Sequence, residues 1–296
     1  MRKGKKAVGI LSALLSALLL CGTLLFPASA ARVSITPGRV TATNVYSYAE
    51  VPVYTESGAR LSGRLIQETT YVPLRAFFAA YMKNASLTYS AKTRTATLTG
   101  DSLTLSATDG SNILYANGRC LYADMPIRIL SDGTMYVPIR SLAKVLTLEV
   151  LWRNETRSVS LVGRAVPLVD GSVFYKEDEV YWLSRIISAE ARGEPFIGQV
   201  AVGNVVLNRV RHSDFPNTIW GVIFDRKYGT QFSPVSYGTI YNNPSSDSII
   251  AAKICLEGYS LSTEALFFMN PRISTSFWIS ENRPFLFTIG KHDFYA

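Results

Sequence analysis

The sequence predicts an α+β protein made of two domains, and three observations carry that prediction. A five-residue motif occurs twice in the first half of the chain, and each copy is followed by strand-like alternation. Two later segments carry apolar residues at helical spacing. Between these parts, residues 164–176 contain Pro167 and Gly171 and lack helical period. With 296 residues, the chain is long enough for both domains.

The first thirty residues have the composition of an export signal. Four basic residues come first, residues 7–26 are mostly apolar, and Ala28-Ser29-Ala30 offers a small-residue cleavage site. We therefore expect residues 1–30 to be a signal peptide and the protein to be exported. The apolar run is also long enough for an uncleaved membrane anchor, which is the alternative.

The charge of the chain is concentrated in that leader. The whole sequence has a net charge of +8, from 30 basic and 22 acidic residues, and removing the four basic leader residues leaves 26 − 22 = +4. This balance is too small to predict a nucleic-acid partner. A net charge of this size is consistent with attraction to an anionic polymer, and equally with an ordinary solvated surface.

Few residues are available for metal or disulfide chemistry. After the leader only Cys120 and Cys255 remain, far apart, which is not the pattern of a disulfide framework or a metal site. With His212 and His292 as the only histidines, a catalytic zinc site lacks its usual ligands. No metal and no cofactor is predicted.

The repeat lies within residues 31–163. Tyr71-Val72-Pro73-Leu74-Arg75 recurs as Tyr136-Val137-Pro138-Ile139-Arg140. Each copy predicts a strand ending at Val-Pro, a short helix (74–82 and 139–146) and a hairpin with period-two alternation. Tyr89 and Trp152 hold equivalent places in the two hairpins. They could stack on a carbohydrate, but aromatic residues on strands usually pack in the core, and the core is the interpretation we prefer.

The second domain is predicted from residue 177 to 296, and its first element is a helix. Val180, Leu183, Ile187 and Glu190 are spaced 3, 4 and 3 apart, so the carboxyl group of Glu190 lies on the apolar stripe. Asp178 is a suitable N-cap, and Gly193 and Pro195 end the helix. Burial and the negative helix end both raise the pKa of Glu190, which suits a general acid. The alternative is a structural hydrogen bond or ion pair.

The rest of this domain alternates between buried and irregular segments. Residues 197–211 predict a helix buried on most sides, in which Gly203 allows a close approach. Residues 215–247 predict irregular loops or a small sheet that shapes a groove. A further helix is expected over 248–258, and aromatic strands from Ala265 onward.

Several separated motifs resemble those of the SleB-type cell wall hydrolases. The resemblance covers roughly residues 179–296. It is carried by the segments Ser188-Ala189-Glu190-Ala191-Arg192-Gly193-Glu194-Pro195, Asn208-Arg209, Gln231-Phe232-Ser233, Ala265-Leu266-Phe267-Phe268 and Ile289-Gly290-Lys291-His292-Asp293-Phe294-Tyr295.

This resemblance implies a lysozyme-like α+β catalytic domain acting on the peptidoglycan polymer in the cell wall or spore envelope. The family glutamate maps onto Glu190, and the implied reaction is that of a lytic transglycosylase. Gln231, Phe232, Ser233 and Tyr241 are the residues we expect to bind substrate. The setting is either spore cortex during germination or vegetative wall turnover.

Two other functions stay open. A hydrolytic muramidase would use a second carboxylate, for which the candidates are Glu194, Asp214, Asp225 and Asp293. A catalytically silent wall-binding protein would keep the groove without the reaction.

The repeat resembles the copper amine oxidase N-terminal-like domain, a small α+β accessory module. Residues 31–163 offer no histidine cluster, so copper is not implied. The context suggests contact with the cell wall or a partner protein, and simple spacing is the alternative.

Overall fold

The structure is a computed structural model that describes residues 48–100, 102–227 and 229–296, and these belong to one compact unit. The predicted signal peptide, and the membrane anchor that is its alternative, lie outside the described residues. Within the described part, no helix is long and apolar enough to cross a membrane.

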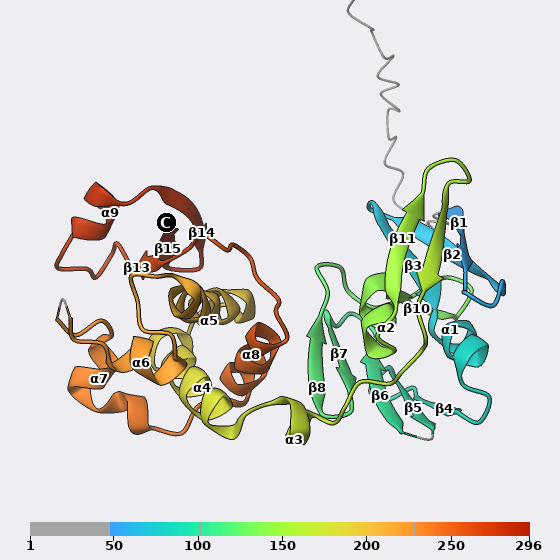
Figure 1. Cartoon of the computed structure of the whole chain (residues 1–296), viewed down its shortest axis with the longest axis horizontal. Coiled ribbons are helices and arrows are strands. Elements are labelled where there is room, and N and C mark those ends of the chain that lie inside the picture. The colour runs from blue at the N-terminus through green and yellow to red at the C-terminus, as the bar shows by residue number, and fades with distance from the viewer. Residues whose placement is uncertain (1–47, 101, 228) are drawn as a thin grey trace, which may run out of the picture. The chain divides into compact units, whose positions relative to one another are not determined.

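The first half of the described chain forms two sheets (Figure 1). The seven-stranded sheet has the order β11-β12-β1-β2-β3-β10-β9, and the five-stranded sheet is a meander of β4 to β8. The bounds are β1 Ala49–Tyr54, β2 Arg60–Ile66, β3 Thr69–Pro73, β4 Ser86–Ser90, β5 Thr95–Gly100, β6 Leu103–Thr108, β7 Ile113–Ala116, β8 Arg119–Tyr122, β9 Arg128–Ile129, β10 Met135–Pro138, β11 Glu149–Arg153 and β12 Ser158–Val162.

The two copies of the motif meet in the seven-stranded sheet. β3 and β10 pair antiparallel with Val72 opposite Val137, so each tyrosine of the motif faces the proline of the other copy. Each strand leads directly into a helix, α1 (Leu74–Tyr81) or α2 (Ile139–Val145). Pro73 and Pro138 are the last residues of the strands and the N-cap residues of the helices, and as prolines they have no N–H to donate to the ladder. The predicted strand, helix and hairpin are present in both copies. The hairpins then enter different sheets, β4-β5 in one and β11-β12 in the other.

A hydrophobic core fills the space between these sheets and helices. Phe77, Phe78 and Leu142 from the helices are fully buried within it. The preferred interpretation of Tyr89 and Trp152 as core residues is wrong, since their exposed fractions are 52% and 49%. Both residues lie on hairpin strands that are covered on one face only. Successive side chains of a strand point to opposite faces, so those on the uncovered face are exposed to solvent.

Helices dominate the second half of the chain. The short helix α3 (Gly171–Phe174) lies within the predicted linker. Its N-cap residue is Asp170, whose carboxylate accepts a hydrogen bond from the Ser172 N–H. The longer helices are α4 (Glu177–Ala191), α5 (Phe196–Arg211) and α8 (Ser246–Leu256). α4 begins two residues earlier than predicted, with Lys176 at the N-cap in place of Asp178. Asp178 therefore lies in the first turn, where an acid complements the helix dipole.

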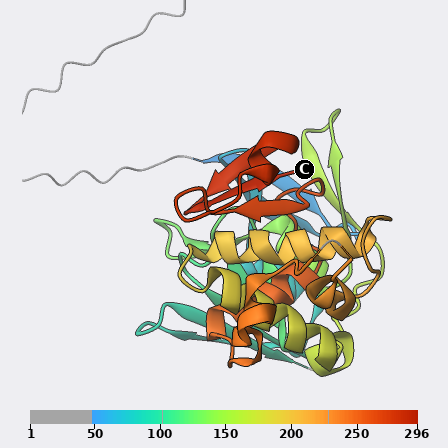
Figure 2. The same ribbon diagram turned by 90° about the vertical axis from the view of Figure 1, so that its left-hand side faces the viewer.

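The helix α5 lies between the other helices and the last sheet. Figure 2 shows it running below the three-stranded sheet and above the helices α4 and α8. Gly203 on α5 explains the tight packing, because a Cβ there would lie 2.7 Å from Cys255 Sγ on α8 and 2.8 Å from Ile187 Cδ1 on α4. The groups that approach Gly203 closely are therefore side chains of α4 and α8. Cys120 and Cys255 are both buried and free.

The segment predicted as loops or a small sheet is organised by short helices instead. These are α6 (Ile219–Phe224), α7 (Ser233–Tyr237) and the 3-10 helix η1 (Thr239–Tyr241). The Thr218 hydroxyl caps α6 by accepting a hydrogen bond from the Gly221 N–H. The Gly and Asn residues of this segment favoured a loop in the sequence analysis, so this helix start was not predicted. The chain ends in the sheet β13-β15-β14, formed by β13 (Phe267–Met269), β14 (Phe285–Ile289) and β15 (His292–Tyr295), with α9 (Trp278–Asn282) before β14.

Candidate active site

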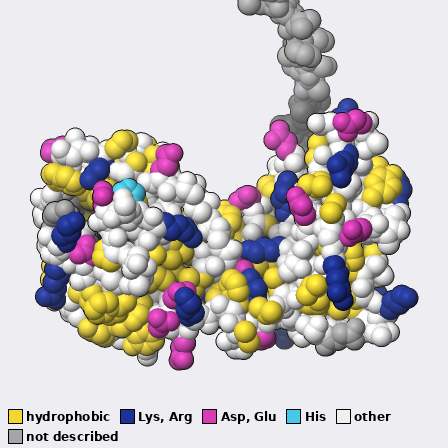
Figure 3. All heavy atoms as spheres, in the orientation of Figure 1, with side chains coloured by type: hydrophobic (Ala, Val, Ile, Leu, Met, Phe, Trp, Pro, Cys, Tyr) yellow, Lys and Arg dark blue, Asp and Glu magenta, His cyan; other side chains and the backbone are white. Residues whose placement is uncertain are grey.

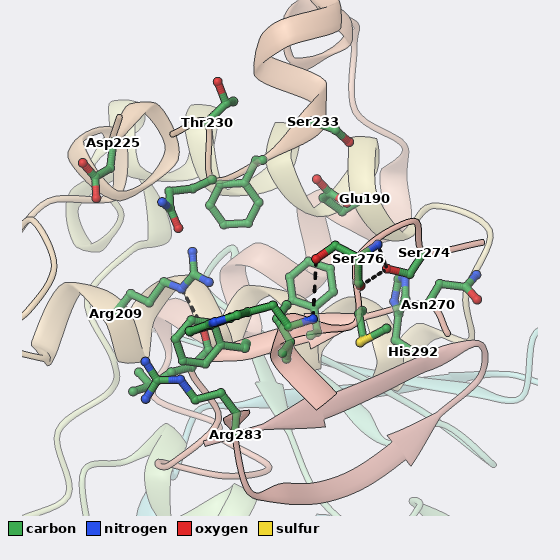
Figure 4. A pocket seen from close by; sticks show the side chains of 18 of the residues that line it. Glu190, Arg209, Asp225, Thr230, Ser233, Asn270, Ser274, Ser276, Arg283 and His292 are labelled. Atoms are coloured by element: carbon green, nitrogen blue, oxygen red, sulfur yellow. Dashed lines mark hydrogen bonds between the residues drawn. The ribbon is translucent and has the colours of Figure 1, made fainter. Parts of the chain in front are cut away.

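A pocket of about 1550 Å³ opens where the ends of α4 and α5 and the last sheet converge. Figure 4 shows its side chains reaching inward from these elements and from the segment between α6 and α7. The titratable residues that line it are Glu190, Arg209, His212, Asp214, Asp225, Lys227, Tyr237, Arg283 and His292.

Glu190 lies in the last turn of α4 and lines this pocket, as the apolar stripe predicted. Burial raises the pKa of its carboxyl group to about 7, and the positive charge of Arg209 opposes part of that rise. Among the described residues, none donates a hydrogen bond to its carboxylate. With a pKa of about 7, Glu190 is protonated in a large share of the molecules near neutral pH, and this proton is available to a ligand, which favours the general acid over the structural alternative.

The end of α5 fixes the opposite wall of the pocket. Asn208 donates to the carbonyl groups of Ser262 and Ala265, at 2.8 and 2.9 Å. Arg209 Nε donates to the Leu266 carbonyl at 2.7 Å. These bonds attach the chain entering β13 to α5, so the Asn-Arg motif aligns the last sheet against the helix that carries it.

Three of the four predicted substrate-binding residues line the pocket. Gln231 is half-buried, Phe232 is buried with its ring 5.2 Å from the Arg209 guanidinium, and Ser233 is exposed at the start of α7. Tyr241 is not among the described residues that line it. Its ring is 62% exposed and packs on Trp182, and Figure 3 shows hydrophobic side chains gathered on the surface over α6 and α7, the region of η1.

The candidates for a second carboxylate divide between two places. Asp214 and Asp225 line the pocket. Asp225 is half-buried and accepts from the Lys227 N–H, and its charge supports the protonated form of Arg209. Glu194 instead accepts from the Lys291 N–H at 2.8 Å, and Asp293 accepts from the Thr288 hydroxyl at 2.6 Å. Neither of these two is among the described pocket residues.

Several pocket residues were not predicted from the sequence. Asn270, Trp278 and Arg283 come from the region between β13 and β14, where no periodic pattern links them to Glu190. His292 was part of a quoted motif, but nothing in the motif indicated that its ring would face the pocket. Its imidazole is buried against Phe268, and burial lowers its pKa, so it is neutral near pH 7.

The fold and the pocket define an α+β domain with a large pocket, lined by one carboxyl group whose pKa is raised to about 7. The comparisons agree with that class. A family model described as Cell Wall Hydrolase matches residues 193–295, and a model described as Copper amine oxidase N-terminal domain matches residues 59–161. A cell wall hydrolase of Oceanobacillus iheyensis is 31% identical over 134 residues, which are 42% of this chain and 90% of that protein. The chain belongs to the cell wall hydrolase family.

Other relatives resemble part of the chain. The spore cortex-lytic enzymes of Bacillus cereus and Bacillus subtilis are each 39% identical over 120 residues, or 40% of this chain. The matched region spans 45% and 38% of those proteins, less than half their length. The solved catalytic domain of the germination-specific lytic transglycosylase SleB from Bacillus anthracis is 37% identical. The match covers 44% of this chain and all of that domain, with a TM-score of 0.38.

Proposed function

We propose that this protein cleaves the glycosidic bond between N-acetylmuramic acid and N-acetylglucosamine in peptidoglycan, as a lytic transglycosylase. The observation that carries the proposal is Glu190: a single carboxyl group, raised in pKa to about 7, hydrogen-bonded to no described residue and open to a large pocket. The solved relative named as a lytic transglycosylase supports the same reaction.

The chemistry needs one group that first gives and then takes a proton. Protonated Glu190 donates to the glycosidic oxygen as the C1–O bond breaks, so the leaving sugar departs with a hydroxyl group. The carboxylate that remains accepts the proton of the muramyl 6-hydroxyl, whose oxygen bonds to C1 and closes a 1,6-anhydro ring. Arg209 lowers the energy of that carboxylate, because its charge acts on the same pocket. Glu190 ends the cycle protonated.

A hydrolytic muramidase is the second candidate, and a specific observation favours it. Asp225 lines the same pocket, so a second carboxylate is available there to orient a water molecule. The negative charge of Asp225, however, also acts on Arg209 and supports the protonated guanidinium. That electrostatic role of Asp225 favours the transglycosylase.

The setting is also proposed. We infer an exported protein that acts in the spore cortex or the cell wall, with residues 177–296 as the catalytic domain. Residues 31–163 would form an accessory domain, joined through residues 164–176, that contacts the wall or a partner protein. Its exposed Tyr89 and Trp152 rings are available for such contact.

Mass spectrometry of the products tests the reaction. Purified cortex and vegetative peptidoglycan are digested, and the released fragments are expected to end in 1,6-anhydro-N-acetylmuramic acid, one water lighter than a hydrolytic product. Reducing muramic ends would establish the muramidase and bring Asp225 into the mechanism. No soluble fragments from either polymer would establish the silent wall-binding protein.

A further inference from the structure

Two residues that line the pocket contain buried nitrogen atoms without a partner. In the described part of the chain, the buried side-chain atoms that lack a hydrogen bond are Tyr81 Oη, Arg128 Nε, Arg185 Nε, Arg209 Nη1 and His292 Nδ1. Only Arg209 and His292 line the pocket. A buried polar group without a partner is energetically costly, so such groups in a pocket indicate where a ligand binds.

Arg209 is the more informative of the two. A neutral imidazole nitrogen can donate or accept, whereas a guanidinium nitrogen can only donate. Burial lowers the pKa of Arg209 to about 10, and the charges of Asp225 and Glu190 limit that fall, so the group stays cationic at neutral pH. A ligand on Nη1 must therefore offer an oxygen that accepts.

The guanidinium is also held in place before any ligand arrives. Its Nε donates a hydrogen bond to the Leu266 carbonyl. The ring centroids of Phe215, Phe232 and Phe267 lie 5.0, 5.2 and 5.2 Å from the guanidinium carbon. The residue as a whole is only 5% exposed. A cation fixed among rings has a defined direction of donation, which is what a site that selects between substituents requires.

The surrounding charges select the kind of acceptor. Asp225 and Glu190 line the same pocket and act on Arg209, so a carboxylate of the ligand would meet two acidic groups. A sugar hydroxyl is a weaker acceptor for a charged donor than an amide carbonyl oxygen, which carries more negative charge. The neutral amide carbonyl fits the site best.

We propose that Arg209 is a specificity-determining residue that donates from Nη1 to an amide carbonyl oxygen of the glycan. This inference rests on the proposed function, since it takes the peptidoglycan strand as the ligand. The carbonyl belongs either to an acetamido group of a sugar or to the lactyl substituent of a muramyl residue, in its amide or lactam form. Removing the acetyl group takes away this carbonyl oxygen and leaves an amine, whose protonated ammonium form a guanidinium repels.

Binding measurements on the Glu190→Gln protein test this without turnover. The probes are N-acetylglucosamine oligomers, the same oligomers after chemical N-deacetylation, and muramyl-containing glycan fragments. If the carbonyl is acetamido, the acetylated oligomers bind at least about tenfold tighter than the deacetylated ones, and Arg209→Gln reduces that preference to within about threefold. If it is the lactyl carbonyl, Arg209→Gln weakens only the muramyl fragments, by a similar factor.

Arg185→Gln is the matched control. Arg185 also contains a buried nitrogen without a partner and lies over an aromatic ring, that of Tyr181, but it does not line the pocket. Its loss removes the same charge and should leave both preferences unchanged. Circular dichroism of each variant establishes that it is folded.

The outcomes separate the two proposals. Unchanged affinity of Arg209→Gln for every probe overturns the role of Arg209. If Arg209→Gln does not fold, Arg209→Lys replaces it and is compared with the Glu190→Gln protein that keeps Arg209. The inference is overturned if that protein binds every probe with the same affinity whether or not the acyl groups are present. Failure of the parent to bind any probe, together with no soluble fragments from active protein, counts against the proposed function itself.

Discussion

The Glu194 carboxylate accepts the Lys291 backbone N–H at 2.8 Å, joining two motifs that lie 97 residues apart in the sequence. The turn before Lys291 depends on this contact. Gly290 has φ +61°, and a Cβ at that position would overlap Glu194 Oε2 and lie 2.8 Å from Pro195 Cδ. Glu194 therefore holds the β14-β15 turn against the start of α5, and we predict that its role is structural and not that of a second catalytic acid.

Replacing Glu194 by alanine should affect stability more than chemistry. The exposed turn loses the side-chain acceptor of one N–H, so we expect a loss of about 0.5–1.5 kcal/mol in the free energy of unfolding. Turnover per folded molecule should stay within about tenfold of the parent. Chemical denaturation and initial rates on purified sacculi measure the two effects, and a rate loss of a hundredfold or more with unchanged stability would make Glu194 catalytic.

Glu190→Gln should have the opposite result. The amide is nearly isosteric but cannot give or take a proton, so activity should fall by at least about a hundredfold with the fold and wall binding retained. Glu194→Gln is the matched control, because its amide oxygen can still accept from Lys291. Near-normal turnover by Glu190→Gln would remove Glu190 from the mechanism.

The pH profile should report the raised pKa of Glu190. The first step needs the protonated acid, so kcat/KM should fall on the alkaline side, with a midpoint near the pKa of about 7 and not near 4.5. Arg209 lowers the pKa of Glu190, so Arg209→Gln should move this midpoint to higher pH. Rates from pH 4 to 9 decide it, and a midpoint that stays in place in Arg209→Gln would show that the two charges do not interact.

The sequence predicted the elements better than it predicted their partners. The spacing of Leu183, Ile187 and Glu190 is a local property of one helix, so the stripe and the inward carboxyl group followed from it. The exposure of Trp152 did not, because it depends on which face of the hairpin another layer covers. Period-two alternation leaves that choice open.

The pocket residues divide in the same way, into those that the sequence indicated and those that depend on tertiary packing. Gln231, Phe232 and Ser233 were found through motif resemblance, while Asn270 and Arg283 lie in a region without period. Their place depends on how α5 aligns the last sheet, through bonds such as that from Arg209 to Leu266. Such contacts join residues 57 positions apart, beyond the reach of any local pattern.

A buried ion pair between Arg119 on β8 and Glu257 after α8 gives the last prediction. The Glu257 side chain is 2% exposed and accepts from Arg119 Nε and Nη2, both at 2.8 Å, and from the Tyr175 hydroxyl at 2.8 Å. Burial raises the pKa of Glu257, but the Arg119 and Tyr175 hydrogen bonds and the Lys144 charge outweigh it, so the pKa is lowered overall.

Arg119→Leu should therefore destabilise the protein by about 3 kcal/mol or more at neutral pH, because it leaves a buried carboxylate without its main partner. A lowered folded pKa means that the stabilisation is present above the ordinary value of 4.5 and is lost as the pH falls through the lowered one. The variant should lose less stability than the parent on acidification. Urea unfolding at pH 7 and at pH 3 measures both effects.

Arg94→Leu provides the control for this ion pair, since Arg94 pairs with Asp109 while 60% exposed. An exposed pair of that kind is worth at most about 1 kcal/mol. The double variant Arg119→Leu with Glu257→Leu should recover most of the stability, because it leaves no unpaired buried charge. If Arg119→Leu costs no more than Arg94→Leu, or the double variant is no better than the single one, the pair does not hold β8 against the end of α8.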